Sequence, residues 1–128
     1  MKHLIRITVV IAMSALLSGC GLACTEAGCE SGLTVKVRTA SGGIPESFSG
    51  TAKFSDRTIA FSCDGTLAGT AEFQCFNAGE VKLSGTGDVE LTIGTETRSL
   101  TPAYTEHRPN GPFCAPVCSN ASETVTLP

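Results

Sequence analysis

The chain has 128 residues, of which 41% are hydrophobic and 16% are charged, and its formal net charge is −3. This length suffices for one domain and leaves no room for a second of ordinary size. The acidic balance, with charges scattered along the chain, argues against a basic surface that would bind nucleic acid.

The N-terminal segment has the parts of a bacterial export signal. Lys2 and Arg6 supply positive charge ahead of an apolar run over residues 7–17, which ends in small residues. The run is shorter than the roughly 20 apolar residues that a membrane-spanning helix needs. Loss of residues 1–19 would remove these two basic side chains and no acidic one, so the net charge would fall from −3 to −5.

The stretch Leu-Ser-Gly-Cys at residues 17–20 matches the lipobox of bacterial lipoproteins, in which the cysteine follows the cleavage site. In such proteins the cysteine thiolate receives a diacylglyceryl group, and the amine freed by cleavage is usually acylated in turn. Several acyl chains give stable anchoring, whereas one gives marginal binding. We predict a signal peptide over residues 1–19 and a lipid on Cys20. The alternative is an ordinary secretory signal with a cysteine at its end.

Residues 20–32 form a leader that contains glycine and cysteine. It is shorter than the Ser- or Gly-rich tether that often follows a lipobox, so we expect the domain over residues 33–128 to lie close to the membrane. The protein should be exported and anchored by its lipid, in the outer membrane if the organism is Gram-negative.

Beyond residue 33 the sequence alternates apolar and polar residues, which predicts short half-buried strands. Gly, Asn and Asp turn signals separate these strands, which recur about every ten residues. No stretch has a convincing helical pattern. The strands are expected at residues 33–37, 48–54, 59–63, 73–75, 81–83, 89–93, 95–101 and 125–127. The predicted core consists of Val35, Val37, Phe48, Phe54, Phe61, Phe73, Leu91 and Ile93.

The residues that could carry catalysis are few. His107 is the only histidine after residue 19, it lies in an irregular Pro-rich segment, and no Gly-x-Ser-x-Gly motif is present. Asp88 and Glu90 alternate on one strand face, which could hold calcium, but a solvated face is the favoured interpretation. We predict no catalytic residue, no metal site and no cofactor, and hence a protein that is not an enzyme.

The most individual stretch runs from Tyr104 to Cys118 and contains three prolines, an Asn-Gly turn and two cysteines near its end. Its Pro-Asn-Gly-Pro-x-Cys-x-Pro-x-Cys segment, at residues 109–118, and the Cys-rich leader resemble a group of small lipoproteins of myxobacteria and related bacteria. The resemblance covers the two ends of the chain and implies a β-sandwich on the cell surface, with no assigned activity.

A more distant similarity is to carboxypeptidase regulatory-like and transthyretin-like sandwiches, which are binding or spacer modules. Together the strand pattern and these resemblances predict a single all-β domain. We expect an immunoglobulin-like or transthyretin-like sandwich of seven to eight short strands, stapled by disulfides.

With Cys20 assigned to the lipid, an even number of cysteines remains, which in an exported chain predicts three disulfides. A zinc site is the alternative, but the cysteine spacings differ from those of zinc knuckles. Turn signals after Cys63 favour antiparallel strands and a disulfide to Cys75. The remaining four cysteines are Cys24, Cys29, Cys114 and Cys118.

Matched spacing suggests how these four cysteines pair. Cys29 lies six residues before Val35, and Cys118 lies seven before Val125. If the first and last strands are parallel neighbours, as in many immunoglobulin-like sandwiches, Cys24 would pair with Cys114 and Cys29 with Cys118. The local alternative, Cys24 with Cys29 and Cys114 with Cys118, stays open at this point.

The loop that these cysteines fix is the best candidate for a contact with a partner. Tyr104, Arg108 and Phe113 are of the types favoured at binding hot spots. An equally good interpretation is that they cover the end of the sandwich. We therefore expect a lipid-anchored envelope protein with a binding or structural role. A small hydrolase or enzyme inhibitor, and a barrel that carries an apolar ligand, are the alternatives.

Overall fold

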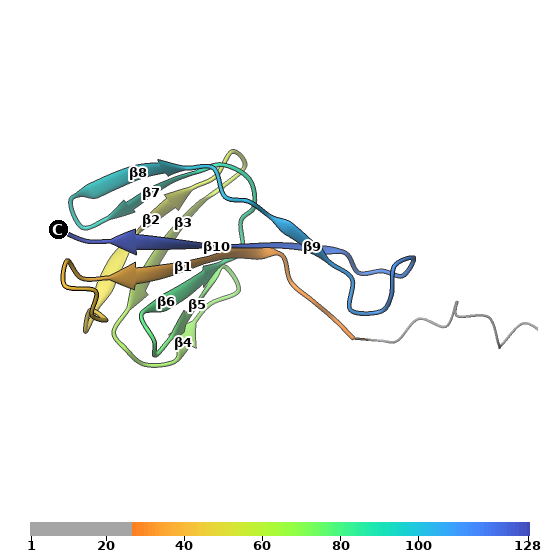
Figure 1. Cartoon of the computed structure of the whole chain (residues 1–128), viewed down its shortest axis with the longest axis horizontal. Helices are drawn as coiled ribbons and strands as arrows, with labels where there is room; N and C mark the ends of the chain where they lie inside the picture. Colours follow the sequence, from red (N-terminus) through yellow and green to blue (C-terminus); the bar gives the residue numbers. More distant parts are fainter. Residues whose placement is uncertain (1–26) are drawn as a thin grey trace, which may run out of the picture.

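The computed structural model describes residues 27–128, which fold into a sandwich of two β-sheets (Figure 1). None of these described residues lies in a helix that could cross a membrane. The predicted signal peptide, Cys20 and Cys24 lie outside the described residues. The strands are β1 (Gly32–Arg38), β2 (Phe48–Lys53), β3 (Thr58–Cys63), β4 (Ala68–Gly69), β5 (Phe73–Phe76), β6 (Glu80–Leu83), β7 (Val89–Ile93), β8 (Glu96–Leu100), β9 (Thr105–His107) and β10 (Cys118–Thr126).

One sheet has six strands in the order β4-β5-β6-β1-β10-β9, and the other has four in the order β3-β2-β7-β8. β1 and β10 pair in parallel over their shared length, from Gly32 opposite Asn120 to Arg38 opposite Thr126. Every other pairing is antiparallel. The expected sandwich is confirmed, and so is the parallel pairing of its first and last strands.

Residues 27–128 form ten strands, two more than the upper limit of the prediction. The additional ones are β4, which has two residues, and β9, in which all three residues are exposed. A strand with no buried residue has no alternation of apolar and polar side chains, because neither of its faces meets the core. The sequence pattern therefore could not reveal them.

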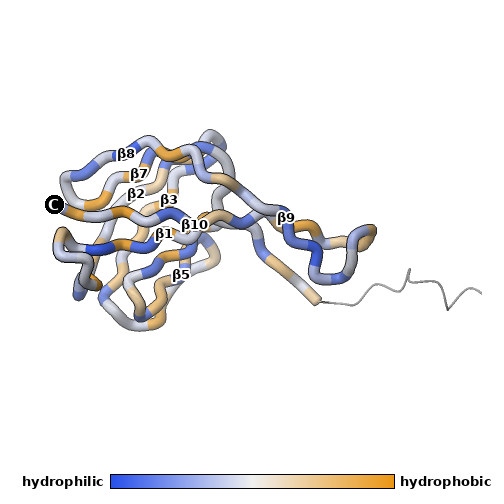
Figure 2. Tube along the Cα trace, viewed as in Figure 1, coloured by the Kyte–Doolittle hydropathy of each residue, from blue (hydrophilic) through white to orange (hydrophobic). Residues whose placement is uncertain are grey.

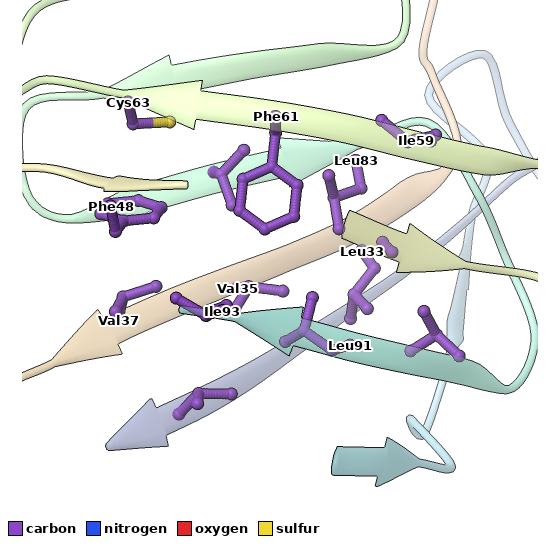
Figure 3. Packing of buried hydrophobic residues seen from close by; sticks show 14 of the residues in the cluster. Leu33, Val35, Val37, Phe48, Ile59, Phe61, Cys63, Leu83, Leu91 and Ile93 are labelled. Atoms are coloured by element: carbon purple, nitrogen blue, oxygen red, sulfur yellow. The ribbon is translucent and has the colours of Figure 1, made fainter. Parts of the chain in front are cut away.

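The core lies between the two sheets and is built from the apolar faces of their strands (Figure 3). Seven of the eight predicted core residues are buried, and the eighth, Phe73, is partly buried against the cluster. The rings of Phe48 and Phe61 pack edge to face with their centroids 6.3 Å apart. Such aromatic pairs add to the stability that burial of the rings provides.

A disulfide joins Cys63 to Cys75, with Cα atoms 5.6 Å apart, as predicted. The reason given for it by the sequence, antiparallel pairing of the two strands, is wrong. β3 pairs with β2, and β5 pairs with β4 and β6, so the cysteines belong to different sheets. The bridge therefore crosses the sandwich and holds the two layers together at their edge.

Gly85 lies where the chain passes from one sheet to the other, and its hydrogen faces the ring of Phe54. A Cβ atom at this position would overlap that ring, which is itself buried. Only glycine leaves the ring enough room. The connection between the sheets thus leaves no room for a side chain at residue 85.

We predict that Gly85→Ala lowers the free energy of unfolding by about 1–3 kcal/mol, because Phe54 must shift to accept the methyl group. The measurement is denaturant unfolding of the two proteins. Gly28→Ala is the matched control, since nothing lies within 4 Å of a Cβ there, and it should change stability by less than about 0.5 kcal/mol. Equal effects of the two substitutions would contradict the prediction.

Candidate functional site

A two-stranded ribbon extends beyond one end of the sandwich (Figure 1). It consists of β9 and the first residues of β10, where Cys118 lies opposite His107 and Asn120 lies opposite Thr105. β1 pairs with β10 only from Asn120 onward, so the first two residues of β10 run past the edge that β1 supplies. We call residues 108–117, which join β9 to β10, the tip loop.

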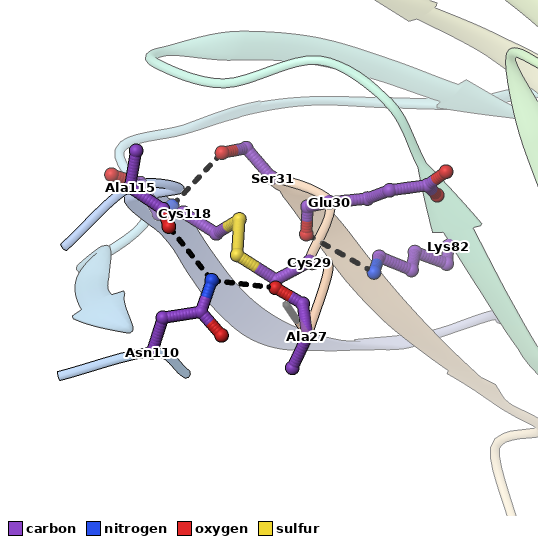
Figure 4. Close-up of a disulfide and its surroundings, with 9 residues drawn as sticks. Ala27, Cys29, Glu30, Ser31, Lys82, Asn110, Ala115 and Cys118 are labelled. Atoms are coloured by element: carbon purple, nitrogen blue, oxygen red, sulfur yellow. Dashed lines mark hydrogen bonds between the residues drawn. A yellow bond between two sulfur atoms is a disulfide. The ribbon is translucent and has the colours of Figure 1, made fainter. Parts of the chain in front are cut away.

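The segment over residues 27–31 runs back from β1 along this ribbon and is fixed to it (Figure 4). A disulfide joins Cys29 to Cys118, with Cα atoms 6.1 Å apart. The backbone N–H of Ser119 donates a hydrogen bond of 2.9 Å to the hydroxyl of Ser31. The chain that leads toward the N-terminus is therefore clamped to the base of the tip loop.

Asn110 completes this clamp from inside the tip loop (Figure 4). Its side-chain amide donates hydrogen bonds to the backbone oxygen of Ala27 at 2.8 Å and to that of Ala115 at 2.7 Å. Asn110 is 7% exposed, and no other polar or charged residue among residues 27–128 is buried. Buried polar groups are stable only when they are hydrogen-bonded, so Asn110 ties both the loop and residue 27 into one unit.

One of the two predicted terminal disulfides lies within the described residues. The Cys29–Cys118 bridge is confirmed, and it contradicts the local alternative, in which each of these cysteines pairs within its own segment. Cys114 is buried and also disulfide-bonded. Its predicted partner, Cys24, lies outside the described residues, so that pairing stays a prediction.

The structure separates the three residues proposed as partner contacts. Tyr104 lies at the start of the ribbon, half-buried, and its hydroxyl donates a hydrogen bond of 3.0 Å to the backbone oxygen of Gly87. Arg108 lies at the base of the tip loop, where its guanidinium is 3.5 Å from the carboxylate of Glu106. Phe113 lies within the tip loop itself. The three side chains therefore do not form one surface.

Phe113 is 86% exposed, the highest value among the large apolar residues of the described chain. Val117, in the same loop, is 43% exposed. Residues 109–118 include no charged side chain, and Figure 2 shows a hydrophobic stretch at the end of the loop farthest from the sandwich. A rigid, clamped loop thus presents an uncharged and partly apolar end to its surroundings.

The residues considered for catalysis lie elsewhere. His107 is exposed on β9, and Asp88 and Glu90 are exposed at the start of β7. Within residues 27–128 no cluster of His, Cys, Asp and Glu is suited to a metal ion. A surface hollow of about 420 Å³ lies beside the clamp, between residues 30–31 and the strands β5 and β6. Its lining includes Glu30, Glu72 and Lys82, so it is not the interior apolar cavity that a ligand-carrying barrel would need.

Two residues that position the tip loop, Asn110 and Ser31, are not revealed by the sequence pattern. Asn110 was interpreted only as part of an Asn-Gly turn, because nothing local indicates that its amide reaches residue 27. Ser31 lies in the leader, where no sequence pattern predicts a hydrogen bond to residue 119. The one available signal was the predicted bridge between Cys29 and Cys118, which places both residues near each other.

The environment of Tyr104 raises the pKa of its phenol, chiefly because burial disfavours the phenolate, with the carboxylates of Asp88 and Glu123 adding to the effect. The folded state thus holds the phenol proton more tightly than the unfolded chain, so this contribution to stability is present below pH 10 and is lost as the pH rises through the folded pKa.

We predict that Tyr104→Phe reduces the loss of stability above pH 10, while costing about 0.5–1.5 kcal/mol at neutral pH through the lost hydrogen bond. Tyr104 is the only tyrosine of the chain, so tyrosinate absorbance during an alkaline titration reports on this group alone. Its midpoint should lie above 10, and a midpoint at or below 10 would contradict the prediction.

The two disulfides should differ in what they contribute. In the chain-entropy model a bridge that spans about 90 residues contributes up to roughly 4.5 kcal/mol, and one that spans about a dozen contributes roughly 3 kcal/mol. With Cys24 and Cys114 also replaced by alanine in both proteins, so that no parallel bridge closes the same long loop, the double variant Cys29→Ala, Cys118→Ala should therefore lose more stability than Cys63→Ala, Cys75→Ala. Denaturant unfolding of the two double variants tests this, and a smaller loss for the first would count against the model.

The comparisons with known proteins add no relative from which a site could be transferred. No family model, no curated protein and no solved structure matches this chain. The candidate site therefore rests on the geometry of the ribbon, the clamp and the tip loop.

Proposed function

We propose that this protein is an exported lipoprotein, anchored through a lipid on Cys20, whose sandwich serves as a binding or structural module of the cell envelope and not as an enzyme. The lipobox at residues 17–20 supports the anchor, and the disulfides support an oxidising compartment outside the cytoplasm. The tip loop is the contact surface in this proposal.

The observation that carries the proposal is the clamp between residues 27–31 and the ribbon. Cys29 follows the predicted anchor by nine residues, and its bridge to Cys118 fixes the chain to the base of the tip loop. A freely hanging module would need no such attachment. The clamp instead keeps one defined end of the sandwich close to the anchor.

The form of the tip loop supports a binding role over a catalytic one. It is held by a buried amide and by disulfides, and it presents an aromatic ring to the outside. Rigid loops that display aromatic side chains are typical of binding surfaces, because little conformational entropy is lost on contact.

We expect Cys20→Ser to block both lipid attachment and cleavage, because serine offers no thiolate to alkylate. The variant should accumulate as the uncleaved precursor, whereas the wild type should take up labelled fatty acid and float with membranes. Cys24→Ser is the matched control in the leader and should still be lipidated. Fatty acid entering the Cys20→Ser protein would refute the proposal.

A further inference from the structure

We propose that the tip loop makes a second contact with the membrane that holds the lipid anchor, with the ring of Phe113 inserted among the lipids at the interface. This inference rests on the proposed function, because it needs the anchor at Cys20. It adds that one end of the sandwich, and not the whole domain at random, faces the lipid surface.

The first argument is the length of chain between the anchor and the clamp. Asn110 holds the backbone of Ala27 against the tip loop, with its amide 2.8 Å from the oxygen of Ala27. Cys20 precedes Ala27 by seven residues, and seven residues span at most about 25 Å even when fully extended. Ala27, and with it the base of the tip loop, therefore stays near the lipid, at a distance of about 25 Å or less that is smaller than the diameter of a domain of this size.

The second argument is the chemistry of the loop. Phe113 is 86% exposed and Val117 is 43% exposed, while residues 109–118 carry no charge. The charged side chains that precede this segment in the sequence, Glu106 and Arg108, pair with each other at the base of the loop. An apolar end with charged groups behind it suits a membrane interface, where apolar side chains enter and charged ones stay among the headgroups.

The other exposed apolar residues do not offer the same arrangement. Leu67 is 71% exposed and Ile44 is 54% exposed. Leu67 precedes Ala68, which pairs with Cys75, and Ile44 lies in the connection that follows β1. Both therefore lie toward the end of β1 at Arg38, whereas the clamp and the ribbon lie beyond its start at Gly32.

The lipid surface is favoured over an acidic or basic partner because the contact offers no charge. The chain that remains after residue 19 has a net charge of −5, which repels anionic lipids. Insertion should thus depend on apolar burial, and it should occur in uncharged phosphatidylcholine and survive added salt, which screens only electrostatic attraction.

The test uses the complete lipidated protein in phosphatidylcholine vesicles. The chain contains no tryptophan, so Phe113→Trp introduces a single reporter at the tip loop. Leu67→Trp is the matched control, because it places the same reporter at an exposed apolar position toward the other end of the sandwich. Each variant is compared in vesicles with ordinary and with brominated acyl chains, since bromine quenches tryptophan on contact.

We expect brominated lipid to quench the emission of Phe113→Trp. In ordinary vesicles the emission should move to shorter wavelength, as it does in an apolar environment. About 1 M salt should change neither the quenching nor the wavelength. The emission of Leu67→Trp should not respond. Circular dichroism and denaturant unfolding verify that each variant is folded. Val117→Trp serves as a second reporter in the same loop if Phe113→Trp does not fold.

Three results would overturn the inference. If both variants float with the vesicles but neither is quenched, the anchor stands and the tip loop does not touch lipid. If the emission of Phe113→Trp moves to shorter wavelength without being quenched, the loop contacts a second copy of this protein instead of lipid. If both are quenched equally, the domain has no fixed orientation. A wild-type protein that carries no lipid on Cys20 would overturn the proposed function itself.

Discussion

The parallel pairing of β1 with β10 brings the two ends of the chain side by side, and both the fold and the candidate site depend on it. The pairing runs from Gly32 opposite Asn120 to Arg38 opposite Thr126, in the middle of the larger sheet. It joins segments separated by nearly the whole domain, so its formation requires closing a long loop at a cost in chain entropy. The bridge between Cys29 and Cys118, at the entrance to the same pair of strands, reduces that cost.

The same pairing explains why the clamp and the tip loop lie at one end. Parallel strands enter a sheet from the same side, so the segments that precede β1 and β10 must lie together. The segment before β1 is residues 27–31, and the segment before β10 is the tip loop. Asn110 and Ser31 then turn this proximity into a defined contact through hydrogen bonds to Ala27, Ala115 and Ser119.

The sequence predicts those strands whose burial on one face produces an alternation of apolar and polar residues. Strands with one buried face, such as β1, β3 and β7, alternate apolar and polar residues and were found. β9 is exposed along its length and leaves no such trace. The bridge between Cys63 and Cys75 was predicted from turn signals, but which sheet each cysteine joins depends on strand order, which local patterns do not encode.

The candidate site was predicted less completely than the fold. Phe113 could be named from its type and its place in a rigid loop, but the sequence does not reveal that Tyr104 turns its hydroxyl to Gly87. It also does not reveal the contact of Asn110 with Ala27, which joins residues 83 positions apart.

The clamp has an energetic consequence for the proposed membrane contact. Burial of one phenylalanine ring contributes about 1.5–3 kcal/mol, which is too little to hold a protein on a membrane by itself. In the proposed arrangement, the lipid anchor and the seven-residue connection would keep the ring near the interface, so that little further translational entropy would be lost on contact. The same free energy would then favour the inserted orientation by roughly 10- to 150-fold.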